Sequence, residues 1–400
     1  MIVDQWAVEE DFLPTSSQDV LRYLEVMSYP IPKHPKTKKP TTGEMDIELL
    51  LGRLEMEDRP DPLLGEMLCG RKLKKGAGFL KDEGILGKDG RMHPEFTLLP
   101  TTGRLSSRRP NFQNQPQGRA DKRPWERVEQ EVAKAIRSTV IPSPGFVLME
   151  ADWKSMEALL LAYFASDPSY ARISRIGAHA YLQSHIEGRP ASLEWDDKKL
   201  KQYLKEVKEG SPEGYHIAKI ANLADTYDVG VNKLSKVLAC SRARAQEIKE
   251  IRKKAFPLIA KWQLATRLRA HNEGKLVNPF GFPGFFWNVF EPVTRPRRDG
   301  KKWVPGPQAH ECLAFLPQST NASMCRQIIV EFGRLALDWM FLLVPIHDAL
   351  LVEVREDMVE EGKRVLRTLM TRPWEELQGL SVAVDIKVGM NWGKMEEEAA

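Results

Sequence analysis

The chain has 400 residues, a formal net charge of +4, 28% charged and 42% hydrophobic residues. This balance is typical of a globular protein and excludes a collagen, a coiled-coil rod and a mostly disordered chain. No apolar run reaches the roughly 18 residues that a membrane helix needs, and the acidic start MIVDQWAVEEDF is unlike a signal peptide. We therefore expect a soluble cytoplasmic protein without membrane association, whose four dispersed cysteines are free thiols.

Basic residues gather in four stretches that also contain Pro, Gly, Asn or Gln, at 33–39, 71–75, 104–123 and 295–302. Each stretch predicts a surface loop, and the four together favour a basic groove for a polyanion. Residues 101–116, TTGRLSSRRPNFQNQP, form a long polar segment without the pattern of a helix or strand. An arginine and three amides suit the acceptors of the DNA minor groove, and a plain surface loop is the alternative. These side chains are Arg104, Asn111, Gln113 and Asn114.

The second half of the chain alternates between short apolar runs and segments with helical periodicity. The triplet Ser211-Pro212-Glu213 is a strong helix start, because it combines a capping hydroxyl, a proline at the first helical position and an acid in the first turn. The predicted strands are 146–149, 341–346 and 350–354, and the predicted helices are 155–163, 195–209, 211–227 and 242–255.

Two acids follow apolar strands, Asp152 after the first and Asp348 in the turn between the last two. An acid at the end of a buried strand is costly unless a cation meets it. If the strands are neighbours in one sheet, the two carboxylates can hold a pair of Mg²⁺ ions roughly 3.5–4 Å apart. Such a pair activates an attacking hydroxyl and stabilises a leaving phosphate oxygen. For either acid alone, a capped or salt-bridged aspartate is the alternative.

The predicted helix after Pro212 carries Tyr215, Lys219, Leu223 and Tyr227 at successive i+4 positions, so these residues share one slowly turning face. A lysine on that face can meet a triphosphate as a point charge, and the second tyrosine can lie beside a base or sugar. The alternative is an ordinary apolar stripe with a lysine that extends to solvent.

Six segments resemble, in chain order, motifs of the family A DNA polymerases, the bacterial DNA polymerase I type and its phage relatives. They are TTGRLSSRRPNFQNQP, ADWKSMEALLLAYFASD with the preceding Arg137, AKIANLADTY, LPQSTNAS, IHDALLVEV and VGMNWG. The resemblance runs from about residue 16 to residue 395. It implies an α+β right-hand fold with an antiparallel palm sheet, helical fingers and a truncated helical thumb. The implied domains are a thumb remnant and lead-in at 1–103, palm at 104–168 and 309–400, and fingers at 169–308.

The resemblance also implies an activity: template-directed 5′–3′ DNA synthesis, in which a primer 3′-hydroxyl attacks a dNTP on primer-template DNA. Asp152, Asp348 and the backbone carbonyl of Trp153 are implied ligands of two Mg²⁺ ions, with Mn²⁺ as a substitute. Lys219 is implied to neutralise the triphosphate and to supply a proton to the leaving group. The other implied nucleotide-binding residues are Tyr215, Leu223, Tyr227 and Glu157, of which the last two exclude ribonucleotides. The implied DNA-binding residues are Arg104, Asn111, Gln113, Asn114, Arg137, Gln318 and His347.

Several positions depart from the family pattern. Tyr215 stands where the family has arginine, and Leu223 stands where it has an aromatic residue. Asp228 replaces a glycine, Ala349 a glutamate and Leu159 an arginine. Because the acids, the lysine, the tyrosine and the glutamate of the sugar gate are kept, we expect activity that is slower or has looser nucleotide affinity.

The resemblance begins just after the first long helix of the family's thumb. We therefore expect no proofreading exonuclease in this chain, weak processivity, and a possible separate polypeptide that supplies the thumb or the exonuclease. A phage-like origin would place the chain in a host cytoplasm.

Two other functions use the same residues. A catalytically inactive, polymerase-like DNA-binding subunit is favoured by Tyr215 and Ala349, but it leaves the two strand-end acids unexplained. A metal-dependent nuclease uses the acids but leaves the amide-rich segment and the predicted helix after Pro212 without a role.

Overall fold

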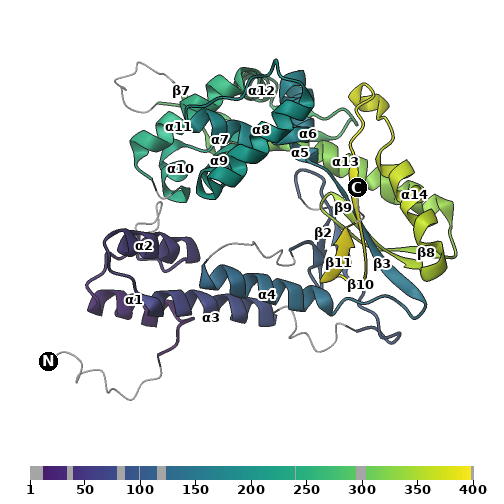
Figure 1. The fold of residues 1–400 in the computed structure, drawn as a ribbon, viewed down its shortest axis with the longest axis horizontal. Helices are drawn as coiled ribbons and strands as arrows, with labels where there is room; N and C mark the ends of the chain where they lie inside the picture. The colour runs from purple at the N-terminus through teal and green to yellow at the C-terminus, as the bar shows by residue number, and fades with distance from the viewer. Residues whose placement is uncertain are drawn as a thin grey trace. The chain divides into compact units, whose positions relative to one another are not determined.

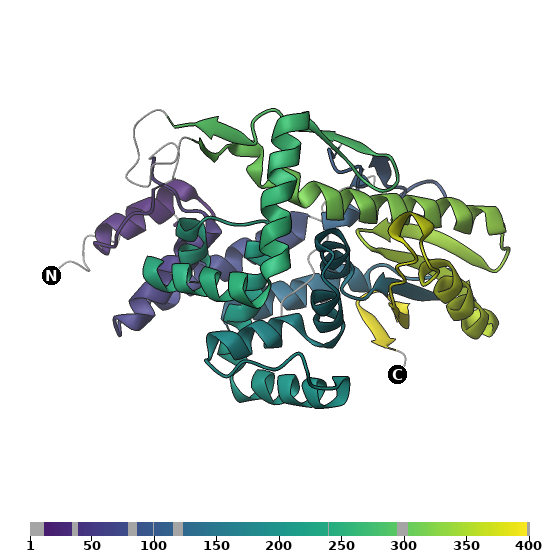
Figure 2. The same ribbon diagram turned by 90° about the horizontal axis from the view of Figure 1, so that it is seen from above.

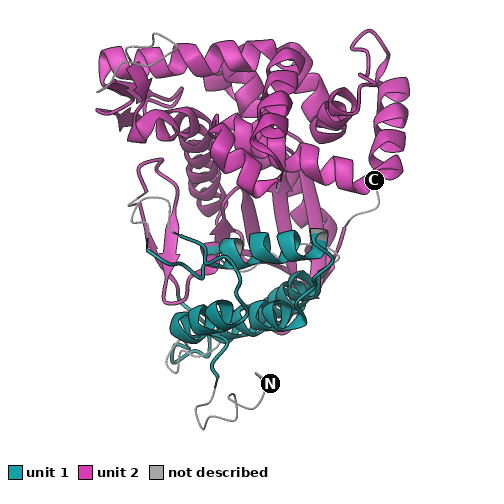
Figure 3. Ribbon diagram, turned by 90° about the vertical axis from the view of Figure 1, so that its left-hand side faces the viewer, with its two compact units in different colours: residues 1–93, 114–140, 392–394 teal, residues 94–113, 141–391, 395–400 magenta. Residues whose placement is uncertain are grey.

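The computed structural model describes residues 12–33, 39–78, 86–98, 100–114, 123–238, 240–293 and 303–397. The chain divides into two compact units, coloured separately in Figure 3. Unit 1 comprises residues 1–93, 114–140 and 392–394, and unit 2 comprises residues 94–113, 141–391 and 395–400. The basic residues predicted at 34–38, 119–122 and 295–302 lie outside the described ranges.

Unit 1 is built from helices around a small apolar core. Val20, Leu24, Ile47 and Leu64 are among the side chains buried there, and Trp125 closes the core from the last helix. Ser16 caps the first helix, because its hydroxyl accepts from a backbone amide in the first turn. The helices are α1 (Ser17–Val26), α2 (Glu44–Met56), α3 (Pro62–Gly78) and α4 (Pro124–Ser138).

The basic stretch at 71–75, predicted as a surface loop, is helical because it belongs to α3. Lys72 is only 8% exposed and forms ion pairs with Glu44 of α2 and Glu129 of α4, the latter at 2.7 Å. A lysine that joins two neighbouring helices in this way is a structural residue of unit 1. The prediction was wrong because glycine and lysine dominate the local composition, whereas packing against α4 decides the conformation.

Unit 2 contains a five-stranded sheet with the strand order β11-β10-β3-β9-β8 (Figure 1). The pairings of β10 with β3, β3 with β9, and β9 with β8 are antiparallel. The sheet therefore places β3 in the middle, next to the β8–β9 hairpin. The strands are β3 (Phe146–Trp153), β8 (Met340–Ile346), β9 (Ala349–Arg355), β10 (Val384–Asn391) and β11 (Lys394–Glu397).

Helices pack on this sheet through their apolar faces. The long helix α13 lies along it, as Figure 2 shows, and α14 packs on β3 and β9. Ile328 and Phe332 of α13 and Leu366 of α14 share one core with Met149 and Val352 of the strands. A second core is formed by α5 to α9, α11, α12 and the first turns of α13. The helices of unit 2 are α5 (Met156–Ala165), α6 (Pro168–Ile176), α7 (Ala178–Ile186), α8 (Asp197–Gly210), α9 (Pro212–Thr226), α10 (Val231–Val237), α11 (Arg242–Ala255), α12 (Pro257–Glu273), α13 (Glu311–Leu335) and α14 (Val359–Met370).

The predicted strands and helices of the second half are confirmed, with small changes at their ends. The strand predicted at 146–149 continues to Trp153, so Asp152 lies inside β3 rather than after it. Ser211 caps α9 as predicted, since its hydroxyl accepts from the amide of Gly214 at 3.1 Å. Short elements that the sequence did not predict are β4 (Lys275–Val277), β5 (Pro283–Phe285), β6 (Phe290–Pro292) and β7 (Trp303–Pro305), with 3₁₀ turns at Pro307–Ala309, Glu356–Met358 and Glu375–Leu377.

The polar segment 101–116 is more ordered than predicted, and its last two residues lie outside the described ranges. It contributes β2 (Ser106–Arg108), which pairs with β1 (Glu95–Thr97), and the 3₁₀ turn Phe112–Asn114. All four cysteines are free. Within the described ranges, no helix is long and apolar enough to cross a membrane.

Candidate active site

The two acids singled out from the sequence lie at one end of neighbouring strands. Asp152 pairs in register with Ala349, the first residue of β9, and Asp348 immediately precedes it. The turn between β8 and β9 consists of His347 and Asp348, and His347 has a left-handed φ of 56°. The amide of Trp153 donates to the carbonyl of Asp348 at 3.4 Å, which joins the turn to β3. The predicted convergence of the two strand ends is therefore confirmed.

Both carboxyl groups are held where ionisation is unfavourable. Protein atoms crowd around Asp152, although it still reaches solvent, and this desolvation together with the charge of Asp348 raises its pKa to about 7. Burial also raises the pKa of Asp348, while the charges of His347 and Arg104 oppose that rise. Crowded acids of this kind gain from a bound cation, which makes this turn a candidate functional site.

A third acid, which sequence reasoning missed, faces Asp152 from the other side. Asp385 of β10 is its partner in register, so the two side chains lie on the same face of the sheet. The charge of Asp385 adds to the rise in the pKa of Asp152, and Lys154 pairs with Asp385 at 2.5 Å. Only the strand register reveals this neighbour, because no motif surrounds Asp385 in the sequence.

Gln113 supports the turn that carries Asp348. Its side chain is 6% exposed. Its amide nitrogen donates to the carbonyl of Pro345, and its amide oxygen accepts from the backbone amide of His347 at 3.1 Å. This differs from the expectation that Gln113 contacts DNA, since both ends of the amide are bonded within unit 2. Asn111, two positions earlier, accepts at 3.4 Å from Ser107 of β2.

Three predicted residues from different helices meet beside the acids. The hydroxyl of Tyr227, at the end of α9, donates to Glu157 in the first turn of α5. The amide of Gln318 in α13 donates to the same carboxylate at 3.4 Å. Burial raises the pKa of Glu157, the charge of Arg104 opposes the rise, and the charge of Asp348 adds to it. Glu157 thus bonds to Tyr227 and lies close enough to Arg104 and Asp348 to feel the charges of both.

The predicted face of α9 carries Lys219 and Leu223 in exposed positions. Burial, followed by the charge of Lys219, lowers the pKa of His179 to about 4, so this neighbouring imidazole is neutral at pH 7. The ring of Tyr215 lies 6.2 Å from that of His179, and the ammonium of Lys208 in α8 lies 5.0 Å from the Tyr215 ring centroid. One cation, Lys208, therefore lies over the aromatic ring on this face of α9.

Two of the predicted DNA-binding residues, Asn114 and Arg137, belong to unit 1. The guanidinium of Arg137 lies 4.4 Å from the ring centroid of Trp392, the tryptophan of the VGMNWG segment. Arg104, Gln318 and His347 belong to unit 2 with both acids.

The chain is similar to DNA polymerases along most of its length. The family model "DNA polymerase family A" matches residues 3–394. The thermostable DNA polymerase I of Thermus filiformis is 25% identical over 378 residues, which cover 92% of this chain and 40% of that protein. DNA polymerase I B (chloroplastic/mitochondrial) of Arabidopsis thaliana is 27% identical over 329 residues, 78% of this chain and 30% of that protein. The chain thus spans less than half the length of these relatives.

A solved structure shares the fold. It is the POL domain of Pol1 from M. smegmatis in complex with DNA primer-template and dNTP, with a TM-score of 0.73 at 20% sequence identity. The similarity covers 96% of this chain and 62% of that one.

Proposed function

The chain belongs to DNA polymerase family A, and on that premise we propose that it catalyses template-directed DNA synthesis. In this reaction the 3′-hydroxyl of a primer attacks the α-phosphate of a dNTP, a dNMP is added to the primer and pyrophosphate leaves. The observation that carries the proposal is the meeting of Asp152 and Asp348 at the end of the central strands, beside Glu157 and Tyr227. In terms of the right-hand architecture, residues 104–168 and 309–400 form the palm, 169–308 the fingers, and 1–103 a thumb remnant.

The proposed metal ligands are Asp152, Asp348 and the backbone carbonyl of Trp153, which hold two Mg²⁺ ions, or Mn²⁺ in their place. The donor set fits Mg²⁺, because this ion is commonly held by one or two carboxylates together with water and substrate phosphates. In the described ranges no group of three or more His, Cys, Asp or Glu side chains is arranged as a metal site. Water and substrate phosphates would supply the remaining ligands of ions held by these two carboxylates. When bound, the ions activate the primer hydroxyl and neutralise the phosphate charge.

Nucleotide binding is assigned to the exposed face of α9. Lys219 neutralises the triphosphate as a point charge and supplies the proton to the leaving pyrophosphate. Tyr215 and Leu223 line the same face. Tyr215 replaces the family's arginine, which contacts the triphosphate, and Leu223 replaces its aromatic residue, which stacks on the nucleotide. Lys208 brings its ammonium to the ring of Tyr215, and we assign to it part of the charge lost with the family's arginine.

Sugar selection is assigned to Glu157 and Tyr227. Their hydrogen bond joins α5 to α9 and closes the space in which a 2′-hydroxyl would lie. Gln318 shares the Glu157 carboxylate and, with Arg104 and His347, contacts the primer-terminal base pair. Asn111, Asn114 and Arg137 are assigned to the duplex, whereas Gln113 positions the turn at Asp348.

Primer extension tests the proposal. The native chain, Asp152→Ala and the control Asp338→Ala, which removes an exposed acid, are incubated with primer-template DNA, Mg²⁺ and the four dNTPs. We expect extension by the native chain and the control, and a loss of roughly a thousandfold or more in Asp152→Ala. DNA binding without extension by the native chain favours the inactive subunit, and shortening of the DNA without dNTPs favours the nuclease. Either result refutes polymerase activity.

A further inference from the structure

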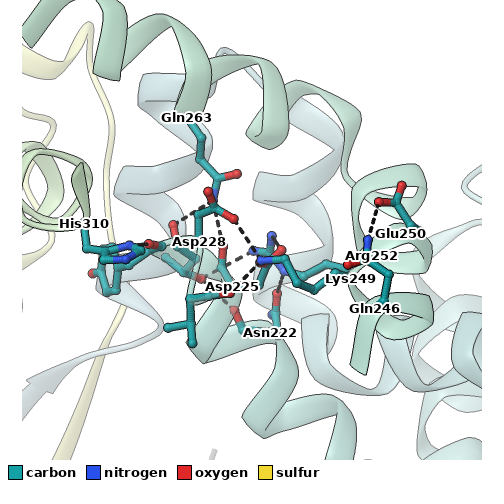
Figure 4. Close-up of polar contacts among 12 residues, drawn as sticks. Asn222, Asp225, Asp228, Gln246, Lys249, Glu250, Arg252, Gln263 and His310 are labelled. Atoms are coloured by element: carbon teal, nitrogen blue, oxygen red, sulfur yellow. Dashed lines mark hydrogen bonds and ion pairs between the residues drawn. The ribbon is translucent and has the colours of Figure 1, made fainter. Parts of the chain in front are cut away.

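A cluster of buried and partly buried charges surrounds the C-terminal end of α9 (Figure 4). We call it the α9 charge cluster and define it as Asp225, Asp228, Lys249, Arg252 and Arg267. We propose that this cluster is a positioning device for Tyr227, and that it sets how strongly the site discriminates between deoxyribonucleotides and ribonucleotides. The second half of this proposal rests on the proposed function, whereas the first half concerns the structure alone.

The cluster is closed by short ion pairs between three helices. Lys249 of α11 donates to Asp225 and, at 2.8 Å, to Asp228. Arg252, one turn further along α11, donates to Asp225 at 2.9 Å. Arg267 of α12 donates to Asp228 at 2.5 Å. Two acids at the end of α9 are therefore held by three cations from two other helices, as Figure 4 shows for Asp225, Asp228, Lys249 and Arg252.

These charges are costly to keep inside the protein. Arg252 is 2% exposed, Asp225 6% and Arg267 7%. An ion pair removed from water gains little net stability, because desolvation of both partners offsets their attraction. Stability alone is therefore a poor reason for three buried charges and two partly buried ones at one helix end. Directional ion pairs that fix a single geometry suit a positioning role.

The backbone carbonyls of Asp225, Thr226 and Tyr227 all accept hydrogen bonds from side chains. The last carbonyls of a helix lack partners within it, and here side chains supply them. Gln263 of α12 donates to the carbonyls of Asp225 at 2.7 Å and Thr226 at 2.9 Å. His310 donates through Nδ1 to the carbonyl of Tyr227 at 2.8 Å. Since the Tyr227 hydroxyl bonds to Glu157, the residue is held at both its backbone and its tip.

Asp228 makes the turn after Tyr227 dependent on the cluster. It has a φ of 53°, a left-handed conformation that costs energy for any residue other than glycine and is tolerated best by Asn and Asp. In the resembling motif a glycine stands at this position. Here the carboxylate of Asp228 bonds to Lys249 and Arg267, so ion pairs stabilise a chain reversal that a glycine adopts without them. Loss of these pairs should loosen the Tyr227 backbone first.

The activity test compares insertion of a single dNTP with insertion of the matching rNTP. Lys249→Met keeps the aliphatic stem but removes the ammonium that the two acids share. We expect its ratio of kcat/KM for dNTP to that for rNTP to fall roughly tenfold, equivalent to about 1.4 kcal/mol. Lys249→Arg, which keeps the charge, is expected to retain most of the discrimination. Glu247→Gln is the matched control, since it neutralises an exposed ion pair with Arg244 on the same helix.

A double-mutant cycle identifies the route of the effect. In a Tyr227→Phe background, Lys249→Met is expected to lower the ratio no further, because the hydroxyl that the cluster positions is already absent. The proposal is overturned if Lys249→Met lowers the dNTP/rNTP ratio as much in the Tyr227→Phe background as in the native chain. It is also overturned if Lys249→Met alone lowers the melting temperature but leaves this ratio unchanged.

Hydrogen exchange separates this proposal from the proposed function. In Lys249→Met the backbone amides of residues 227–229 are expected to lose protection, while those of α5 keep it. Unchanged protection refutes the positioning role even if the native chain is an active polymerase. If the native chain inserts no nucleotide, the proposed function and the selectivity claim fail together, and the exchange result still decides whether the cluster holds Tyr227.

Discussion

The substitution Asp152→Asn should stabilise the metal-free chain while it removes activity. Crowding by protein atoms and the charge of Asp348 raise the pKa of Asp152 from 3.8 to about 7. Its ionised form is therefore disfavoured in the folded state relative to the unfolded state. Asparagine has nearly the same shape and carries no charge, so it removes this penalty together with a proposed metal ligand. Activity and stability should change in opposite directions, as they do where a site is built for function.

The size and pH dependence of the effect follow from the two pKa values. An interval from 3.8 to about 7 corresponds to an upper bound of about 4 kcal/mol, at about 1.4 kcal/mol per pH unit. Since Asp152 reaches solvent, screening reduces this to about 1–2 kcal/mol. The folded chain binds the proton more tightly, so the native protein loses stability as the pH rises from about 4 to about 7. The advantage of Asp152→Asn is therefore absent at pH 4 and full above pH 7.

Thermal unfolding in the presence of a chelator measures this difference. We expect the melting temperature of Asp152→Asn to exceed that of the native chain by about 1–3 °C at pH 8 and to equal it at pH 4. Asp338→Asn, an exposed acid outside the site, should match the native chain at both values. Excess Mg²⁺ should stabilise the native chain and leave Asp152→Asn unchanged. A variant that is less stable than the native chain at pH 8 would falsify the electrostatic account of the site.

Four further outcomes follow from the geometry. Glu157→Ala should raise ribonucleotide incorporation, and unchanged selectivity would remove this residue from the sugar gate. Lys208→Ala should raise the KM for dNTPs several-fold with little effect on kcat, whereas Lys205→Ala on the exposed face of α8 should change neither; equal effects would contradict the assignment. Gln113→Ala should cost about 1–3 kcal/mol of stability, because it leaves a buried carbonyl and amide unpaired, and urea unfolding measures this. Burial alone would raise the pKa of Asp228, but its bonds with two cations outweigh that and lower it. Native stability should therefore fall on acidification below about pH 4, and Asp228→Asn should flatten this part of the pH profile.

The sequence predicted the parts of the site that depend on local pattern. Apolar runs that end in an acid identified β3 and the β8–β9 hairpin, and the Ser211-Pro212 pair identified the start of α9. Such features need only a few neighbouring residues, since strand periodicity and helix capping are local effects. The resemblance supplied the order of the motifs, which no local rule gives.

The parts that the sequence did not reveal depend on long-range contacts. Gln113 bonds to a residue 232 positions away, so its burial depends on how the chain folds back. Asp385 becomes a neighbour of Asp152 only through the register of two antiparallel strands. Lys72 was assigned to a loop from its composition, yet two acids from other helices bury it. In each case the neighbouring residues in the sequence give no sign of the side chain's role, because its partners come from distant parts of the chain.

The two groups of acids in unit 2 differ in how their charges are balanced, and that difference separates their roles. Asp225 and Asp228 are matched by three cations, of which Arg252 and Arg267 are buried, so their charges are satisfied before any ligand binds. Asp152 and Asp348 have raised pKa values instead, because desolvation outweighs the cations near both, and for Asp152 the charge of Asp348 adds to the rise. Acids that are already paired cannot gain much from a metal ion, whereas crowded acids can. The same element types thus produce two different sites: paired charges at the end of α9, where we propose a positioning role, and uncompensated acids at the end of β3, where we propose a bound cation.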